Sequence, residues 1–90
     1  MSLSKDIPII NKLGLHLRAA AQFVQTANKH RSDVWVSKDE RRVNGKSIMG
    51  VMTLVAAVGS VIKVEVEGPD EQDCMAALET LAAGRFGEKD

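Results

Sequence analysis

Hydrophobic and polar residues alternate most clearly in residues 61–67, near the end of the chain. Ile62, Val64 and Val66 share one side of an extended segment, and charged residues occupy the positions between them. This alternation is typical of a strand with one packed face and one face in water. Three shorter segments also have strand character: 7–10, 34–37 and 42–44.

Three other segments have the periodicity of amphipathic helices. In residues 17–28, one face carries Ala20, Phe23, Val24 and Ala27. A second helix is predicted from residue 48 to about 55, and a third over 71–83, between a capping Asp70 and a terminating Gly84. The predicted buried stripe of the third helix consists of Cys74, Ala77, Leu78 and Leu81. Residues 85–90 are predicted to be a polar tail.

The order of elements is strand, helix, strand, strand, helix, strand, helix. Because the strands are apolar on one side only, the order predicts an α+β fold with two layers. We expect a four-stranded antiparallel sheet with three helices on one face, formed by a single domain over residues 1–90.

A histidine and an arginine, His16 and Arg18, lie where the first helix should begin, just after Gly14. The glycine allows a sharp turn, so His16 is expected at the helix N-terminus, where unpaired amides favour an anion. A phosphate on the imidazole would meet the first amides of the helix, and the guanidinium could bind it with two hydrogen bonds. The alternative is a solvated histidine with Arg18 on the wet face.

A serine, Ser47, precedes the second helix and is expected to cap it. Val51, Leu54 and Val55 are predicted to face the sheet. Ile48, Met49 and Met52 would then lie partly outside, as an adaptable contact surface. The alternatives are that Met52 belongs to the core and that Ser47 acts only as a cap.

Composition excludes several classes of function. Twelve basic and twelve acidic residues cancel, and aromatic residues make up 3% of the chain, which argues against nucleic-acid binding. The two histidines, the cysteine and the methionines do not form a metal-binding set, and no cofactor is expected. No carboxylate pair suits acid–base catalysis, so we expect a chain on which larger partners act rather than a free-standing enzyme.

The location in the cell is also indicated. Cys74 is the only cysteine, so no disulfide can form within the chain, and a reducing compartment is natural. No signal peptide and no membrane-spanning stretch is recognised, so no membrane insertion is expected. The expected location is the cytoplasm.

Two segments together resemble the HPr family, the histidine-containing phosphocarriers of the bacterial phosphoenolpyruvate-dependent phosphotransferase system. They are Gly14-Leu15-His16-Leu17-Arg18 and Asn44-Gly45-Lys46-Ser47-Ile48-Met49-Gly50. Either segment alone is a weak signal, but both in this order of strands and helices are a strong one. The resemblance extends from about Lys5 to Ala83.

The resemblance implies an open-faced β-sandwich with strand order 1-4-2-3. It also implies a phosphoryl-transfer intermediate in which enzyme I phosphorylates Nδ1 of His16 and Arg18 helps to position the phosphate. Ser47 matches the serine that a dedicated kinase phosphorylates in many bacteria, a modification that regulates carbon use. The acceptors would be the A component of a sugar permease or regulatory proteins, including transcriptional regulators. A monomer is expected.

Two positions depart from the usual family pattern. Ala19 stands where proline is common, and Leu17 stands where a small residue is usual between the histidine and the arginine. The Arg-Ala-Ala run resembles the nitrogen-related regulatory branch. Leu17 places a larger apolar group beside the site and would reshape the docking surface. Both departures bear on the choice of partners more than on the carrier role.

A second class of function uses the same residues differently. The chain would then be a non-catalytic regulatory module that docks its partners through Ile48, Met49 and Met52, and His16 would be incidental.

Overall fold

The computed structural model describes residues 2–89, and within them it contains four strands, three α-helices and one short 3-10 helix. In chain order the elements are β1 (Ser2–Pro8), α1 (Leu17–Asn28), β2 (Asp33–Lys38), β3 (Arg41–Asn44), α2 (Ile48–Met52), β4 (Val61–Glu67), α3 (Glu71–Ala83) and the 3-10 helix η1 (Arg85–Gly87). The strands form one antiparallel sheet in the order β1-β4-β2-β3. The predicted α+β fold and strand order are confirmed.

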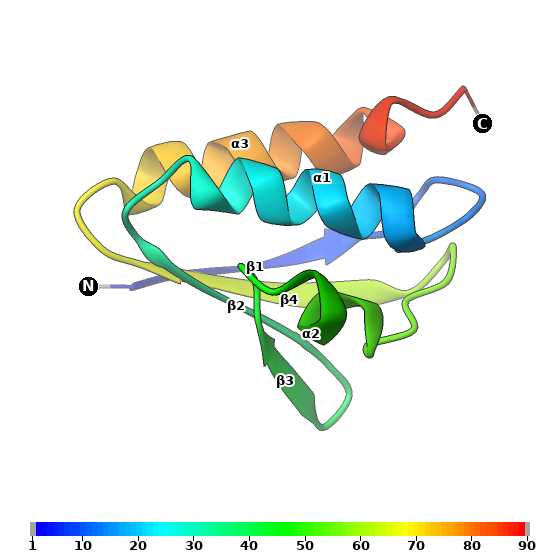
Figure 1. Ribbon diagram of the computed structural model, residues 1–90, viewed down its shortest axis with the longest axis horizontal. Coiled ribbons are helices and arrows are strands. Elements are labelled where there is room, and N and C mark those ends of the chain that lie inside the picture. Colours follow the sequence, from blue (N-terminus) through cyan, green and yellow to red (C-terminus); the bar gives the residue numbers. More distant parts are fainter. Residues whose placement is uncertain (1, 90) are drawn as a thin grey trace.

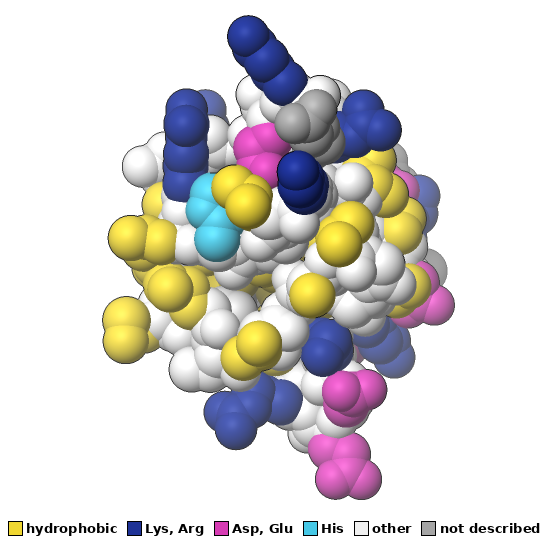
Figure 2. All heavy atoms as spheres, turned by 90° about the vertical axis from the view of Figure 1, so that its right-hand side faces the viewer, with side chains coloured by type: hydrophobic (Ala, Val, Ile, Leu, Met, Phe, Trp, Pro, Cys, Tyr) yellow, Lys and Arg dark blue, Asp and Glu magenta, His cyan; other side chains and the backbone are white. Residues whose placement is uncertain are grey.

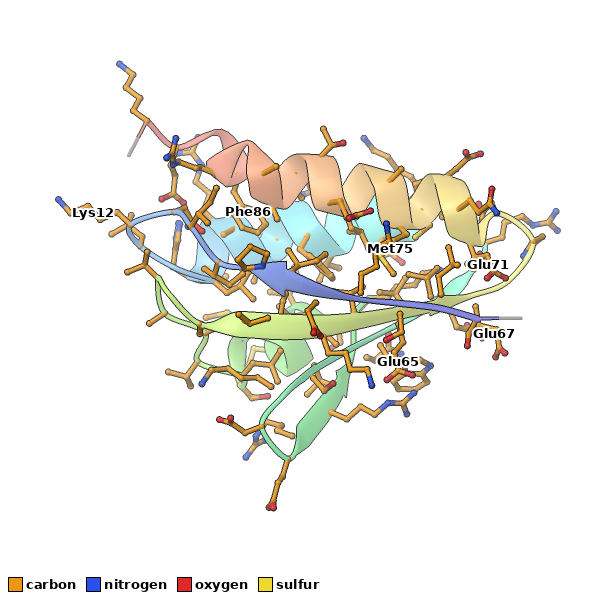
Figure 3. The ribbon with its side chains drawn as sticks, turned by 180° about the vertical axis from the view of Figure 1, so that it is seen from behind. Lys12, Glu65, Glu67, Glu71, Met75 and Phe86 are labelled. Atoms are coloured by element: carbon orange, nitrogen blue, oxygen red, sulfur yellow. The ribbon has the colours of Figure 1, made fainter. Side chains whose placement is uncertain are left out.

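The core lies between the sheet and the helices. Helices α1 and α3 run side by side over one face of the sheet (Figure 1), and α2 packs against α1 and β3. In β4, Ile62, Val64 and Val66 are buried, as the alternation predicted. Glu65 and Glu67 lie on the opposite face, which no helix covers (Figure 3). The sheet therefore has one dry face and one wet face.

Strand β1 is longer than predicted and begins earlier. The hydrophobic run indicated residues 7–10, but the strand spans Ser2–Pro8 and pairs with β4 along its whole length. The ladder with β4 supplies backbone hydrogen bonds to polar residues such as Ser4 and Asp6, which periodicity alone does not reveal. Ile9 has already left the ladder, and its amide donates to the Ser60 carbonyl.

Helix α2 ends sooner than predicted. It covers Ile48–Met52 rather than reaching residue 55. Val51 and Leu54 are buried as expected, but Val55 has a left-handed φ of +50° and is 76% exposed. The prediction that Val55 faces the sheet is therefore wrong, because the reversal of the chain at this residue turns its side chain outward.

Helix α3 has the predicted bounds but a different buried face. Cys74 and Leu78 are buried as predicted, whereas Ala77 and Leu81 are only half-buried. Met75 and Ala82 complete the buried set instead, and Met75 is directed toward the sheet (Figure 3). The face is displaced because α3 packs on β1 and α1 together.

The prediction that residues 85–90 form a polar tail is also wrong, because part of this segment is ordered and buried. Residues 85–87 form η1, and Phe86 within it is 3% exposed and belongs to the hydrophobic core. Arg85 and Phe86 have φ values of +57° and +52°, so the chain bends back toward the molecule after α3. This bend carries Glu88 to the start of α1.

Asp70 stands at the N-cap position of α3, as predicted, but its side chain makes no capping hydrogen bond to that helix. Its carboxylate instead accepts the amides of Arg31 and Ser32, each at 3.0 Å, and also the Ser32 hydroxyl. The hydroxyl of Ser32, helped by the two amides, lowers the pKa of Asp70 to about 2. The carboxylate thus ties the loop after α1 to the start of α3.

Replacing Asp70 with asparagine is expected to lower the melting temperature at pH 7 by several degrees, because an amide has only one acceptor oxygen. Since the folded pKa is lowered from 3.8 to about 2, the stabilisation is complete at neutral pH and is lost as the pH falls through this range. Thermal unfolding of both proteins between pH 7 and pH 2 measures this. The difference in melting temperature between the wild type and Asp70→Asn should shrink at the acid end. A difference that stays constant with pH would contradict the stabilising role of the Asp70 carboxylate.

Candidate functional site

His16 stands at the N-cap of α1, directly after a tight loop. Gly14 in this loop has a φ of +67°, and a Cβ added to it would lie 2.5 Å from the Ala56 carbonyl oxygen. The Leu15 amide donates to the same oxygen at 2.8 Å. Glycine therefore permits both the left-handed turn and the close approach of the two loops that hold His16 at the helix start.

The backbone at the start of α1 is arranged to receive an anion. The first hydrogen bond of the helix runs from the Ala20 amide to the His16 carbonyl, at 2.8 Å. The amides of Leu17, Arg18 and Ala19 precede this bond and have no earlier turn of helix to bind. Because the helix dipole adds positive potential here, a phosphoryl group on His16 would be favoured.

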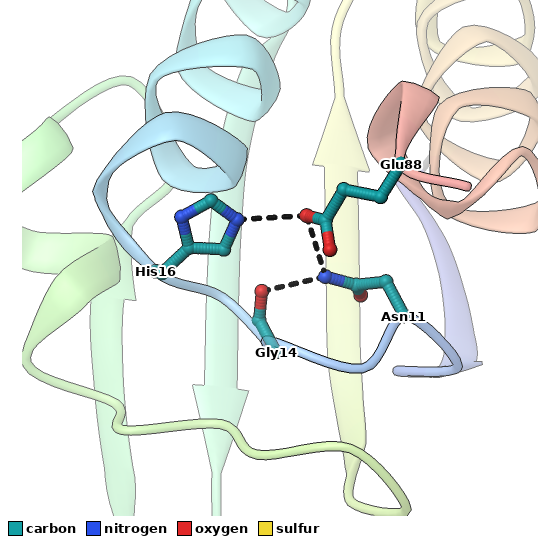
Figure 4. Close-up of polar contacts among 4 residues, drawn as sticks. All are labelled: Asn11, Gly14, His16 and Glu88. Carbon is teal, nitrogen blue, oxygen red and sulfur yellow. Dashed lines mark hydrogen bonds and ion pairs between the residues drawn. The ribbon is translucent and has the colours of Figure 1, made fainter. Parts of the chain in front are cut away.

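The imidazole of His16 contacts a carboxylate from the other end of the chain. Its Nε2 lies 2.7 Å from Oε2 of Glu88, across a separation of 72 residues (Figure 4). The Asn11 side chain is fully buried, and its Nδ2 donates to the same oxygen at 3.0 Å and to the Gly14 carbonyl at 2.7 Å. The loop before α1 and the C-terminal segment are thus joined through one carboxylate.

The contact has an electrostatic consequence for the carboxyl group. The hydrogen bond with His16, and after it the bond from Asn11, holds the pKa of Glu88 below its ordinary value, against the opposing effect of desolvation. Glu88 is therefore ionised at neutral pH. The sequence contains no signal for this contact, apart from Phe86, the one aromatic residue in the final segment.

The predicted phosphate-binding arginine, Arg18, is exposed. It lines a shallow hollow of about 500 Å³ together with Lys12, Glu88 and Lys89. The structure therefore brings Arg18 close to the carboxylate that contacts His16, within a group of three cationic side chains. Its predicted two-point contact with phosphate stays a prediction.

Ser47 is the N-cap of α2, and its hydroxyl accepts the Gly50 amide at 3.1 Å. Ile48 and Met49 lie outside the core, with Met49 74% exposed. Met52, in contrast, is half-buried and packs against the core, so the three residues are not equally exposed. Leu17 of α1 is 61% exposed.

A second hollow connects α2 with the histidine. It is lined by Leu13, Leu15, His16, Met52, Val55, Ala56 and Ala57. Leu13 and Val55 are 65% and 76% exposed, and sequence reasoning did not identify either as surface beside the site. Figure 2 shows hydrophobic side chains gathered around a histidine on this face of the molecule. We call Leu13, Leu17, Ile48, Met49 and Val55 the apolar patch.

A family model described as the PTS HPr component phosphorylation site matches residues 3–83. The chain belongs to the HPr family. The phosphocarrier protein HPr of Neisseria meningitidis serogroup B is 57% identical over 86 residues, covering 96% of this chain and 97% of that protein.

Solved structures agree. An HPr structure from Thermoanaerobacter tengcongensis has a TM-score of 0.94 and 49% identity, covering 98% of this chain and 99% of that one. An HPr dimer from the same organism has a TM-score of 0.78 and 52% identity, covering 91% and 94%.

Membership of the HPr family confirms the resemblance drawn from the two segments and makes the chain a phosphocarrier of the phosphotransferase system. The two departures from the usual HPr pattern occupy different environments. Ala19 is 1% exposed and belongs to the core, whereas Leu17 is on the surface. Within residues 2–89, no helix is both long enough and apolar enough to span a bilayer.

Proposed function

We propose that this HPr-family chain accepts a phosphoryl group on His16 from phosphorylated enzyme I and passes it to the A component of a sugar permease or to a regulatory acceptor. The observation that carries the proposal is the placement of His16. The imidazole stands at the N-cap of α1 with 30% of its side chain exposed, and Nε2 is engaged by Glu88. Nδ1 is then the nitrogen left to meet a donor.

The chemistry needs little from the chain itself. His16 acts as a nucleophile toward the donor and as a leaving group toward the acceptor, and the partner enzymes supply the remainder of each site. The helix N-terminus stabilises the transferred group while it resides on the ring. Arg18 is proposed to bind the phosphoryl oxygens through its planar guanidinium, which can form two parallel hydrogen bonds.

The apolar patch is proposed as the surface that partners cover. Exposed aliphatic and thioether side chains adapt to different partner surfaces, and here they lie on α1, α2 and the loops beside His16. Leu17, at the position next to His16, is expected to influence which partners fit. The carrier is proposed to act as a monomer, because His16, Asn11 and Glu88 all come from one chain. The reduced Cys74 suits action in the cytoplasm.

Incubation with phosphoenolpyruvate and enzyme I, followed by intact mass measurement, tests the proposal. A gain of one phosphate that is acid-labile and base-stable is expected. A chain that binds partners through Ile48, Met49 and Met52 without gaining this phosphate would instead be a non-catalytic binding module.

Ser47 is proposed as a site of regulatory phosphorylation. A phosphate there adds roughly −1.5 to −2 charge at a helix N-terminus, which the fold should tolerate. The charge would lie beside Ile48 and Met49, which must lose water when a partner docks. Replacing Ser47 with aspartate should therefore slow phosphorylation of His16 by enzyme I at least about tenfold, mainly through weaker binding. Initial rates measured against enzyme I concentration report this.

Ser4→Asp is the matched control, because it adds the same charge to the exposed edge strand β1, outside the apolar patch. Its rate should equal that of the wild type. Equal rates for Ser47→Asp and the wild type would contradict the regulatory role. A large fall in the melting temperature of Ser47→Asp would identify Ser47 as a structural cap instead.

A further inference from the structure

The C-terminal segment presents Glu88 to His16 in a fixed orientation. Phe86, two residues earlier, is in the hydrophobic core, and the Glu88 side chain is only 16% exposed. The buried amide of Asn11 donates to the same carboxylate oxygen that contacts His16. Glu88 is therefore held by groups other than the histidine, and its position does not depend on the state of the imidazole.

We propose that Glu88 is a positioning residue that keeps the proton of His16 on Nε2, so that Nδ1 is the nucleophile and the phosphorylated ring stays in its transferable form. This inference rests on the proposed function of His16. It assigns a role to a residue that neither sequence segment of the HPr resemblance contains. The lowered pKa of Glu88 supports it, since the carboxyl group is an acceptor at neutral pH.

The transfer balances without moving a proton. In the neutral ring, Nε2 carries the hydrogen and Nδ1 carries a lone pair, which forms the new bond to phosphorus. The bond from phosphorus to the donor breaks, and the donor keeps that electron pair. The ring is now an imidazolium with phosphorus on Nδ1 and hydrogen on Nε2, and its positive charge lies beside the Glu88 carboxylate, 2.7 Å from Nε2.

Onward transfer is the reverse process at the ring. The bond between Nδ1 and phosphorus breaks, its electron pair returns to Nδ1, and the neutral ring leaves with hydrogen still on Nε2. If Nε2 lost its proton, the ring would have to leave as an anion, which is a poor leaving group. A carboxylate that holds the proton on Nε2 therefore favours transfer in both directions.

The other charged groups near the ring make the negative charge of the Glu88 carboxylate necessary. The hollow on the Glu88 side is lined by the cations Lys12, Arg18 and Lys89, which attract phosphate but oppose a positive ring. The hollow on the α2 side contributes only apolar residues besides His16. Figure 4 shows Glu88 approaching one nitrogen of the ring while the other nitrogen lies on the opposite side. The carboxylate can thus stabilise the ring without occupying the phosphoryl position.

Two variants of Glu88 separate the effect of its hydrogen-bond acceptor on the proton position from the effect of its negative charge on the phosphorylated ring. Glu88→Ala removes the acceptor, so hydrogen should shift partly to Nδ1 and phosphorylation by enzyme I should slow about tenfold. Glu88→Gln keeps an acceptor oxygen, which the Asn11 amide orients toward itself and His16, so hydrogen should stay on Nε2. Without the negative charge, however, phospho-His16 should become resistant to hydrolysis at a lower pH than in the wild type.

Nitrogen-15 chemical shifts of the imidazole report which nitrogen carries the proton, and hydrolysis rates of phospho-His16 from pH 5 to 9 report the charge effect. Glu67→Ala is the control, because it removes an exposed carboxylate from the face of the sheet that no helix covers, and it should change neither readout. An unchanged proton position in Glu88→Ala would overturn the proposal. The nitrogen shifts are measured without enzyme I, so they judge Glu88 even if the wild-type chain accepts no phosphate from that enzyme.

Discussion

Replacing His16 with alanine is expected to abolish phosphoryl acceptance and to leave the fold intact. The side chain is partly exposed and makes no capping hydrogen bond to α1, so its removal leaves the helix start unchanged. The substitution removes the hydrogen bond between the imidazole and Glu88, but the Asn11 amide still binds that carboxylate. Intact mass after incubation with phosphoenolpyruvate and enzyme I should show no added phosphate, while the melting temperature should change by no more than a few degrees.

His30→Ala provides the matched control for this experiment. His30 is the other histidine of the chain and lies just beyond the C-terminal end of α1, where its Nδ1 is 3.1 Å from the Thr26 carbonyl oxygen. This end of the helix carries negative rather than positive potential and does not favour phosphate. The variant should accept phosphate as the wild type does. A phosphate that persists in His16→Ala, or disappears in His30→Ala, would contradict the assignment.

Replacing Phe86 with alanine should lower the free energy of unfolding by about 3–5 kcal/mol, because it removes a buried aromatic side chain and leaves a cavity. Phe86 is 3% exposed and lies under the end of α3 (Figure 3). The free energy of unfolding of a native protein is roughly 5–15 kcal/mol in total, so the loss is severe. Chemical denaturation of both proteins, monitored by circular dichroism, measures this change in the free energy of unfolding.

Two controls accompany Phe86→Ala. Phe86→Leu retains most of the apolar volume and should cost clearly less. Lys89→Ala changes an exposed residue of the same segment and should stay within about 0.5 kcal/mol of the wild type. A loss below about 1 kcal/mol for Phe86→Ala would mean that the segment is not anchored by this residue.

The sequence by itself determined the elements whose signals are local. The alternation of β4 and the periodicity and terminators of α1 and α3 predicted the bounds that the structure has. The turn at Gly14 and the cap at Ser47 also depend on residues a few positions away, and the structure contains both. His16 was identified because glycine, histidine and a helix start are adjacent in the chain.

Tertiary structure determined those bounds and buried faces that depend on contacts with a distant segment of the chain. β1 extends through polar residues because β4 supplies its hydrogen bonds, and the buried face of α3 is displaced because α1 and β1 meet it from two sides. The early end of α2 follows from the left-handed turn at Val55, which the apolar periodicity of that segment does not reveal.

The candidate site also has a part that local sequence predicts and a part that only the fold determines. Local sequence placed His16 and Arg18 at the N-terminus of a helix, where physical chemistry favours phosphate. Only the folded chain brings Glu88 to Nε2 of His16, across 72 residues. No periodicity or motif predicts such a contact, because it depends on burial of Phe86 and on the direction in which two left-handed residues turn the chain.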